Sequence, residues 1–384
     1  MDLKVTAITV IMLICTFYSY FSFCSSHAYQ IVKAGGIDPD HIITMMFNDV
    51  PTNPYNPFPG ELYNHPGDDA RDVYAGVVVD YEKTEVSPEN LVKVLTGDES
   101  TGKKVLKSTE EDNVFLFFSD HGGADMLAMP GGNIHSKDLL NAIQTMHDKK
   151  MYKKFVLYIE ACYSGSMGVG FPEDLGITIV TAANDRESSW GWYCGEEAVV
   201  KGKNIGSCLG DEFSVFWMED TDKGEQKTET LEEQWTRIKA GVTKSHASRY
   251  GDVSFSQDLI GEYVGFPEKK VYKEVPVEAW DSRDNKMLYF RHKYLTSTGA
   301  EKRKYEKLYL EEVSLRQQID RYFNSIAKAD RLYSAYPGPV KDFNCYKAGI
   351  AQMEAIFGRN DYQFKYYNVL ANMCNENPLV FAKY

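Results

Sequence analysis

The chain has 384 residues, of which 43% are hydrophobic, enough for a sizeable core and for more than one domain. Its 42 lysines and arginines against 55 aspartates and glutamates give a formal net charge of −13, which argues against nucleic acid as a partner and fits an acidic compartment. The 26 tyrosines and 20 phenylalanines exclude a disordered chain.

The N-terminal segment allows three interpretations. Lys4 precedes an apolar run over residues 5–15, and small residues at Cys24 and Ser26 could frame the cleavage site of a signal peptide. A membrane anchor is the second interpretation, but threonines and serines interrupt the run, which is short for a span. The third takes the β-branched stretch 6–14 as a core strand.

Four near-continuous apolar runs then predict parallel strands that are covered on both faces. They are Ile42–Phe47, Val114–Phe118, Phe155–Ile159 and Ile177–Thr181. Helical patterns alternate with them: residues 27–33 form one, and Ser136 is the predicted N-cap of another over 137–150. This alternation predicts an α/β sandwich with a mainly parallel sheet, whose functional site lies at the carboxyl ends of the strands.

The character of the chain changes near residue 270. Residues 271–284 are predicted to be extended, and residues 286–307 are basic on an otherwise acidic chain. From about residue 311 onward, apolar residues recur at helical spacing. We therefore predict four segments: 1–24 as a signal peptide or replacement first strand, 25–270 as the catalytic domain, 271–310 as a linker, and 311–384 as a helical domain.

Two segments carry the chemistry. His121 follows one predicted strand and precedes Gly122, and Cys162 follows another and opens a turn rich in small residues. A thiol beside an imidazole predicts a cysteine nucleophile with its base. The backbone N–H groups of Gly122 and Cys162 would form an oxyanion hole. The alternative is a strand-end histidine and a small core cysteine.

The other cysteines are informative by position. Cys194 and Cys208 bracket a short loop, and Cys345 and Cys374 bracket a helical stretch. Two local pairs and one free thiol are typical of a secreted thiol enzyme, the alternative being reduced cysteines in a cytosolic protein. Neither a zinc spacing nor a glycine-rich phosphate loop is present in the sequence, so we expect no metal and no cofactor.

Ordered motifs resemble the legumain family of cysteine endopeptidases (asparaginyl endopeptidases, vacuolar processing enzymes), which have a caspase-like fold. The resemblance spans about residues 27–384. The matching motifs are His27-Ala28-Tyr29-Gln30, Ser119-Asp120-His121-Gly122, Glu160-Ala161-Cys162, Ala182-Ala183-Asn184, Glu187-Ser188-Ser189, Leu209-Gly210-Asp211 and Asp342-Phe343-Asn344-Cys345. The resemblance implies a caspase-like three-layer sandwich over 25–270, an activation linker over 271–310, and an inhibitory helical prodomain over 311–384.

The resemblance also implies a role for individual residues. It implies that Cys162 is the nucleophile, that His121 is the general base and acid, and that Gly122 and Cys162 form the oxyanion hole. Asp120 would be the succinimide-forming residue linked to ligation, and the substrate pocket would consist of Glu160, Ser188, Ser189 and Asp211. The implied disulfides are Cys194–Cys208 and Cys345–Cys374. Carboxylates satisfy the NH₂ of an asparagine side chain, and a pocket built for an amide rejects side chains that cannot pair with it.

By the same resemblance, the substrates are proteins and peptides with asparagine, or with aspartate at acidic pH. The prodomain would inhibit the enzyme and leave when carboxylates protonate, with processing at Asp281, Asp284 or Asn285. Cystatin-type inhibitors are further expected partners. The expected location is the lysosome or vacuole, or outside the cell, reached through the secretory pathway.

The segment before His27 departs from the family. An Arg-His-Gln-Ala-Asp segment is expected there, and its pocket arginine would fall near Tyr20 or Phe21. We therefore expect either a truncated or mis-assembled product without its first strand, or a replacement strand without the catalytic loop. Weak or no asparaginyl cleavage follows, because a lost charged hydrogen bond costs about 2–3 kcal/mol.

Three alternatives remain open at this point. A catalytically impaired homologue would act as a binding or regulatory protein. An anchor-type transamidase would need a C-terminal membrane span, whereas residues 311–384 are polar. A caspase or metacaspase would not explain the cysteines of the C-terminal segment.

Overall fold

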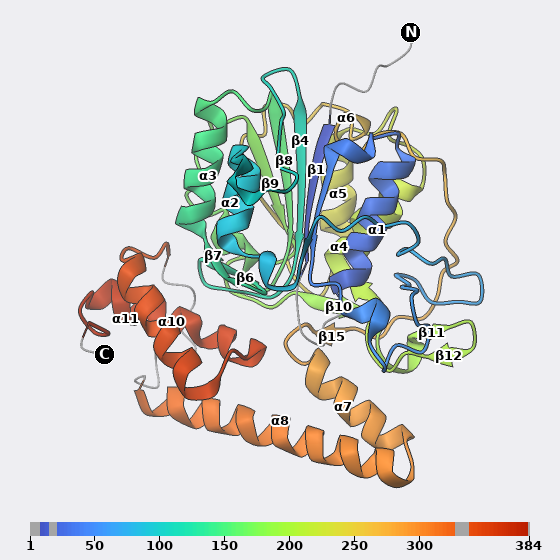
Figure 1. The fold of residues 1–384 in the computed structure, drawn as a ribbon, viewed down its shortest axis with the longest axis vertical. Helices are drawn as coiled ribbons and strands as arrows, with labels where there is room; N and C mark the ends of the chain where they lie inside the picture. Colours follow the sequence, from blue (N-terminus) through green and yellow to red (C-terminus); the bar gives the residue numbers. More distant parts are fainter. Residues whose placement is uncertain (1–7, 15–20, 327–337, 383–384) are drawn as a thin grey trace.

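The computed structural model describes residues 8–14, 21–326 and 338–382. A seven-stranded sheet forms the centre of the molecule (Figure 1), and its neighbouring strands are parallel except at the antiparallel edge strand β14. In spatial order the strands are β14 (Ser248–Gly251), β9 (Ile177–Thr181), β8 (Lys154–Glu160), β4 (Asn113–Ser119), β1 (Ile8–Ile14), β2 (Ile42–Met46) and β3 (Tyr81–Glu82). The predicted mainly parallel α/β sheet is confirmed, including all four apolar runs as strands.

The N-terminal strand β1 holds a central position, between β4 and β2. Its register pairs Ile14 with Ser119 of β4 and with Met46 of β2, so these strands end level with one another. Of the interpretations of the N-terminal segment, the structure contains the core strand, over residues 8–14. Tyr20 lies outside the described residues, and Phe21 begins a helix.

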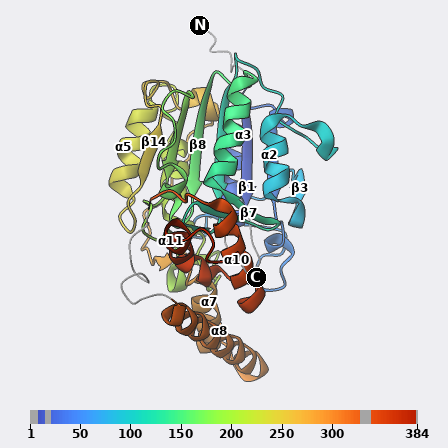
Figure 2. The same ribbon diagram turned by 90° about the vertical axis from the view of Figure 1, so that its left-hand side faces the viewer.

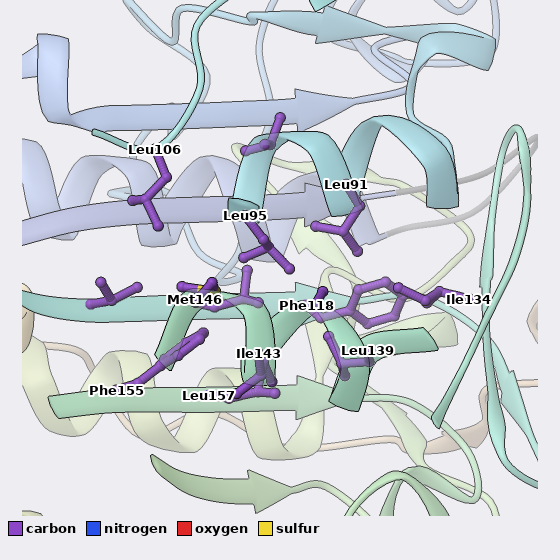
Figure 3. Packing of buried hydrophobic residues seen from close by; sticks show 14 of the residues in the cluster. Leu91, Leu95, Leu106, Phe118, Ile134, Leu139, Ile143, Met146, Phe155 and Leu157 are labelled. Carbon is purple, nitrogen blue, oxygen red and sulfur yellow. The ribbon is translucent and has the colours of Figure 1, made fainter. Parts of the chain in front are cut away.

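Helices cover both faces of the sheet and make three layers (Figures 1 and 2). The helices of one face are α2 (Pro88–Thr96) and α3 (Ser136–Asp148), and those of the other are α1 (Phe21–Ala34), α4 (Glu212–Asp222), α5 (Leu231–Gly241) and α6 (Gly261–Val264). Strand β4 supplies both cores: Leu116 and Phe118 belong to the cluster under α2 and α3 (Phe118 is labelled in Figure 3), while Phe115 and Phe117 pack against Trp217 of α4. Burial on both faces explains why this strand is apolar throughout.

Two helix boundaries differ from the prediction. Helix α1 begins at Phe21 rather than at residue 27, because its buried face includes Cys24 and the serines beside it, which hide the apolar pattern. Helix α3 has His135 as its N-cap residue and not Ser136. The Ser136 hydroxyl instead donates a hydrogen bond to Asp125 Oδ1 at 2.6 Å.

The C-terminal part is helical from Asn285 onward rather than from about residue 311. Its elements are α7 (Asn285–Thr296), α8 (Gly299–Ile326), α10 (Phe343–Phe357), the 3₁₀ turn η7 (Asp361–Tyr366) and α11 (Tyr367–Glu376). Helices α7 and α8 form a hairpin whose buried aromatic residues are Tyr289, Phe290 and Tyr305. Charged residues on the outer faces mask these aromatics, so the segment has the composition of a linker. None of the described helices combines the length and apolar character of a membrane span.

These helices cover the end of the sheet at which β4 and β8 finish (Figures 1 and 2). The docking surface is the small sheet of β5 (Gly122–Gly123), β6 (Met126–Met129) and β7 (Gly132–His135). Met126 and Ala128 share one buried cluster with Tyr346, Ile350 and Leu370 of the C-terminal helices. Two further small sheets consist of β13 (Gly210–Asp211), β10 (Trp190–Trp192) and β15 (Trp280–Asp281), and of β11 (Val199–Val200) and β12 (Lys203–Asn204).

The structure contains both predicted disulfides, Cys194–Cys208 in the part of the chain that forms the sheets and Cys345–Cys374 between α10 and α11. The second closes a sequence separation of 29 residues. We expect replacement of both cysteines by serine to cost the C-terminal helices about 2–4 kcal/mol, because the unfolded segment regains loop entropy.

Hydrogen exchange of the α10 and α11 amides measures this loss. The matched control replaces Cys194 and Cys208, which should leave exchange in α10 and α11 unchanged. Equal protection of these helices with and without the Cys345–Cys374 bridge would contradict the expectation.

Candidate active site

His121 and Cys162 are brought together by neighbouring parallel strands. Ser119, at the end of β4, pairs with Glu160 at the end of β8, and the Asp120 N–H continues the pairing to the Glu160 carbonyl at 3.0 Å. Beyond the strands, the two segments touch through their backbones. A Cβ atom added to Gly122 would lie 2.3 Å from the Cys162 carbonyl oxygen, so only glycine permits this approach.

The Cys162 thiol is buried and faces Ser189. The Ser189 backbone N–H donates to the sulfur at 3.3 Å, and the Ser189 hydroxyl lies 3.7 Å from it. Burial raises the pKa of Cys162, while the charge of Arg283 opposes this rise. The covered thiol is therefore held in its protonated, poorly nucleophilic form.

The His121 imidazole meets a carboxylate of the C-terminal helices. Its Nε2 lies 3.3 Å from Oδ2 of Asp361, the first residue of η7. Burial by itself would lower the pKa of His121, but the Asp361 charge and hydrogen bond raise it above the usual value. Burial likewise works against ionisation of Asp361, yet His121 lowers the pKa of that carboxyl. The two groups form an ion pair between the segment after β4 and the C-terminal helices.

Two buried carboxyl groups lie beside this pair. Glu160 accepts hydrogen bonds from the Ser214 N–H at 2.9 Å and from the Ser214 hydroxyl at 2.8 Å, and the Cys24 thiol lies 3.6 Å from Asp211. Burial and the neighbouring Asp211 raise the pKa of Glu160 well above its usual range, and burial raises the pKa of Asp211 to about 7. Within the described residues, no lysine or arginine forms an ion pair with either carboxyl.

The predicted pocket residues fall into two adjacent groups. One group consists of the carboxyl residues Glu160 and Asp211, and the other of Ser188 and Ser189. Asp211 of β13 pairs with Gly191 of β10, and this pairing places the first group near Ser189. Ser189 faces Cys162, whereas the Ser188 hydroxyl accepts a hydrogen bond from Arg283 at 2.7 Å. In Asp120, Oδ1 accepts a hydrogen bond from the following N–H, that of His121, at 2.5 Å.

The segment before α7 crosses the site as a strand. Trp280 and Asp281 of β15 pair with Gly191 and Trp190 of β10, and the Ser282 N–H donates to the Ser189 carbonyl at 3.1 Å. Of the predicted processing positions, Asp281 lies in this strand, Asp284 forms an ion pair with Arg316, and Asn285 is buried. Residues 280–282 therefore lie against Ser189, whose hydroxyl faces the Cys162 thiol.

Sequence reasoning missed four residues at the site: Tyr163, Arg283, Arg316 and Asp361. Arg316 of α8 donates to the Arg283 carbonyl at 2.7 Å and is ion-paired with Glu312 and Asp284. Arg283 and Asp361 lie more than a hundred residues along the chain from His121 and Cys162, and Arg316 contacts Arg283 rather than either of these residues. No spacing rule links such positions. In the described part of the chain, no cluster of three histidine, cysteine or acidic residues suits a metal ion.

The family model described as the peptidase C13 family matches residues 16–266 of this chain. The chain belongs to the peptidase C13 family. It is 36% identical over 385 residues to the vacuolar-processing enzyme delta-isozyme of Arabidopsis thaliana, which covers 91% of this chain and 82% of that relative. Legumain of Canavalia ensiformis is 33% identical, with 91% and 80% covered. Hemoglobinase of Schistosoma japonicum is 38% identical over 261 residues, with 67% and 59% covered.

Among solved structures, caspase-1 from Spodoptera frugiperda matches with a TM-score of 0.41 and 10% identity, over 70% of this chain and 92% of that chain. Membership of the C13 peptidases makes the chain a cysteine-type endopeptidase, and its substrates are proteins or peptides. For a C13 peptidase, the arrangement around Cys162 has an evident feature: both the thiol and the imidazole are covered by the chain's own C-terminal third.

Proposed function

We propose that the chain is the zymogen of an endopeptidase that cleaves after asparagine, and after aspartate at acidic pH, through Cys162 and His121. The observation that carries this proposal is the double cover of the site. Asp361 engages His121, and the strand around Ser282 lies on Ser189 beside the thiol. A cover that pairs with the base and contacts the neighbour of the nucleophile at once is what an inhibitory prodomain requires.

The proposed reaction follows from these positions once the cover has left. His121 takes the Cys162 proton, the thiolate attacks the scissile carbonyl, and the backbone N–H groups of Cys162 and Gly122 stabilise the oxyanion. His121 then protonates the leaving amine, and water hydrolyses the thioester. An incoming peptide amine would instead give ligation. The close approach of the His121 amide to the Asp120 carboxyl supports a succinimide at that position.

The proposed asparagine pocket consists of Glu160, Asp211, Ser188 and Ser189. Because burial and mutual repulsion favour a shared proton on the two carboxyls at neutral to acidic pH, the pair offers both an acceptor and an O–H donor. An amide side chain needs both. A charged aspartate would be repelled, and it would enter only when protonated.

The names of the relatives favour a vacuolar or lysosomal compartment for this chain. The net charge of −13 and the two disulfides suit an acidic, oxidising route of that kind. Cystatin-type inhibitors would compete with substrates for the uncovered cleft.

The test is incubation of the full chain at pH 4–7, with its products sequenced by mass spectrometry. We expect cleavage after asparagine or aspartate between residues 281 and 298, where the strand gives way to the α7–α8 hairpin. Cys162→Ala and His121→Ala should each reduce the rate more than about 1,000-fold, since a nucleophile or its base is lost. His147→Ala, on the exposed side of α3 and away from the site, is the control and should leave cleavage intact, while equal rates for all three variants would refute the proposed dyad.

A second candidate is a catalytically impaired homologue that serves as a binding or regulatory protein. The observation that favours it is the pair Glu160 and Asp211, for which the described residues supply no arginine or lysine partner. A thiol probe separates the two functions. Alkylation of Cys162 in acid without any peptide cleavage would favour the impaired homologue.

A further inference from the structure

The Arg283 side chain is buried in the site, with only 7% of its surface exposed. One guanidinium nitrogen donates to the Ser188 hydroxyl at 2.7 Å and the other to the Gly122 carbonyl at 3.3 Å. Its Cζ lies 4.8 Å from the centre of the Tyr163 ring. We call Ser188, Gly122 and Tyr163 the guanidinium cradle.

The cradle belongs entirely to the catalytic domain and carries no charge. A hydroxyl, a carbonyl and an aromatic face accept the two nitrogens and the plane of the guanidinium, which suits arginine better than the point charge of lysine. The carboxylates near the guanidinium, those of Asp281 and Asp284, come from the linker itself, whereas the nearby Cys162 thiol and Tyr163 hydroxyl lie on the side of the cradle. When the linker leaves, both carboxylates leave and the cradle stays.

The geometry of the cradle is fixed by the backbone next to the nucleophile. Tyr163 directly follows Cys162 and has a φ of 56°, a left-handed conformation that non-glycine residues adopt rarely and mostly at functional sites. Gly122 is held against the Cys162 carbonyl by the close approach described above. The acceptors are therefore positioned by the same turn that positions the thiol.

The linker reaches the cradle in the manner of an extended peptide ligand. It adds β15 to the edge of β10, and the Ser282 hydroxyl lies 3.2 Å from the Ser189 hydroxyl, which itself faces Cys162. Adding a strand to a sheet edge, with side chains in flanking pockets, is a common mode of peptide recognition. Arg283 is the residue immediately after the one bound to Ser189.

We propose that the guanidinium cradle is a substrate subsite, which selects peptides with an arginine beside the residue that lies against Cys162. This inference rests on the proposed endopeptidase function and adds a second specificity element to it. In the zymogen, Arg283 occupies the subsite. In the uncovered enzyme, a substrate arginine takes its place.

The first test needs no catalysis. The full-length Arg283→Ala variant leaves the cradle vacant. N-acetyl-arginine methylamide is added to this variant, and mass spectrometry then measures the rate at which iodoacetamide alkylates Cys162. We expect saturable protection of Cys162, with about tenfold more of the neutral citrulline analogue needed for the same effect. Adding Ser188→Ala should reduce the protection by arginine several-fold, while Arg186→Ala on the surface should not.

Equal protection by arginine and citrulline, or protection by neither, would overturn the subsite. The second test gives the acid-processed chain asparagine peptides with arginine or citrulline scanned over the three positions on either side. Faster cleavage at one arginine position supports the subsite. Cleavage at equal rates would overturn the subsite alone, whereas arginine protection without any cleavage would leave the subsite standing and refute the endopeptidase function.

Discussion

In the Asp361→Asn variant we expect Cys162 to be alkylated about tenfold faster than in the unchanged chain at pH 5–7. Asp361 forms the ion pair with His121, and its side chain is only 27% exposed. Removing one partner of a largely buried pair leaves the other charge without compensation, which costs docking about 1–3 kcal/mol at this exposure. The C-terminal helices should then leave the site more often.

The pH dependence of this effect has a definite sign. Pairing with Asp361 raises the pKa of His121 in the docked state. The ion pair's contribution to docking is therefore fully present below the usual histidine pKa of about 6.5 and is lost as the pH rises through the raised value. Because pairing lowers the docked pKa of Asp361, the contribution is lost on the acid side only below that carboxyl's usual pKa of about 4. The difference between Asp361→Asn and the unchanged chain should therefore be largest between these limits.

Two measurements separate docking from a direct effect on the imidazole. Hydrogen exchange over η7 should accelerate in the variant, and Cys162 alkylation should accelerate with it. The control is Asp138→Asn, which removes the exposed pair with Lys347 across the same interface and should change either rate less than about threefold. Unchanged exchange and alkylation in Asp361→Asn would show that the ion pair does not hold the cover in place.

The central fold could be predicted from sequence because its strands are apolar on both faces. Two long runs of β-branched and aromatic residues, each bounded by turns, end near His121 and near Cys162. The sequence therefore predicts that both runs are strands and that both end at the same edge of the sheet. Helix α1 was predicted too short because Ser25 and Ser26 are buried within it. Polar residues in a buried helix face remove the periodic signal on which such predictions depend.

The candidate site was predictable only where it is local. His121, Gly122 and Cys162 stand in recognisable turns, and the pocket residues followed from ordered motifs. Arg283 contacts Ser188 and Gly122 across 95 and 161 residues, Asp361 pairs with the distant His121, and Arg316 reaches the site only by contacting Arg283. Arg316 and Asp361 themselves stand in charge-rich helical segments of ordinary composition. Their roles become visible only when the C-terminal helices are seen against the end of the sheet.

A second titrating group, His135, should act in the opposite direction to His121. It ends β7 on the docking surface, and the rings of Phe343 and Tyr346 of α10 lie 5.7 Å from its own. The charged groups around it are Lys347 on α10 and Asp138 on α3, with the Asp125 backbone on the third side. Burial under α10, reinforced by Lys347, lowers the pKa of His135 to about 4.

Because of this lowered pKa, protonation of His135 should favour undocking of the C-terminal helices. The undocked histidine, with a pKa of about 6.5, binds a proton in a pH range in which the docked histidine stays neutral. Docking therefore weakens as the pH falls from about 6.5 towards 4. The shift amounts to about 3 kcal/mol at most, or roughly a hundredfold in the docking equilibrium. In mild acid the pair of His121 and Asp361 still favours docking, so the proposed acid release would have to come from His135 together with the carboxylates of the interface.

We therefore expect His135→Gln, which stays neutral at every pH, to keep the C-terminal helices docked in acid. The measurement is the hydrogen-exchange rate of the α10 amides in the variant, divided by the rate in the unchanged chain, at pH 7, 5 and 4. This ratio should fall progressively from pH 7 to pH 4. His147→Gln on the exposed side of α3 is the matched control and should give a ratio that does not vary with pH. Parallel acid profiles for His135→Gln and the unchanged chain would assign the proposed acid release to the interface carboxylates alone.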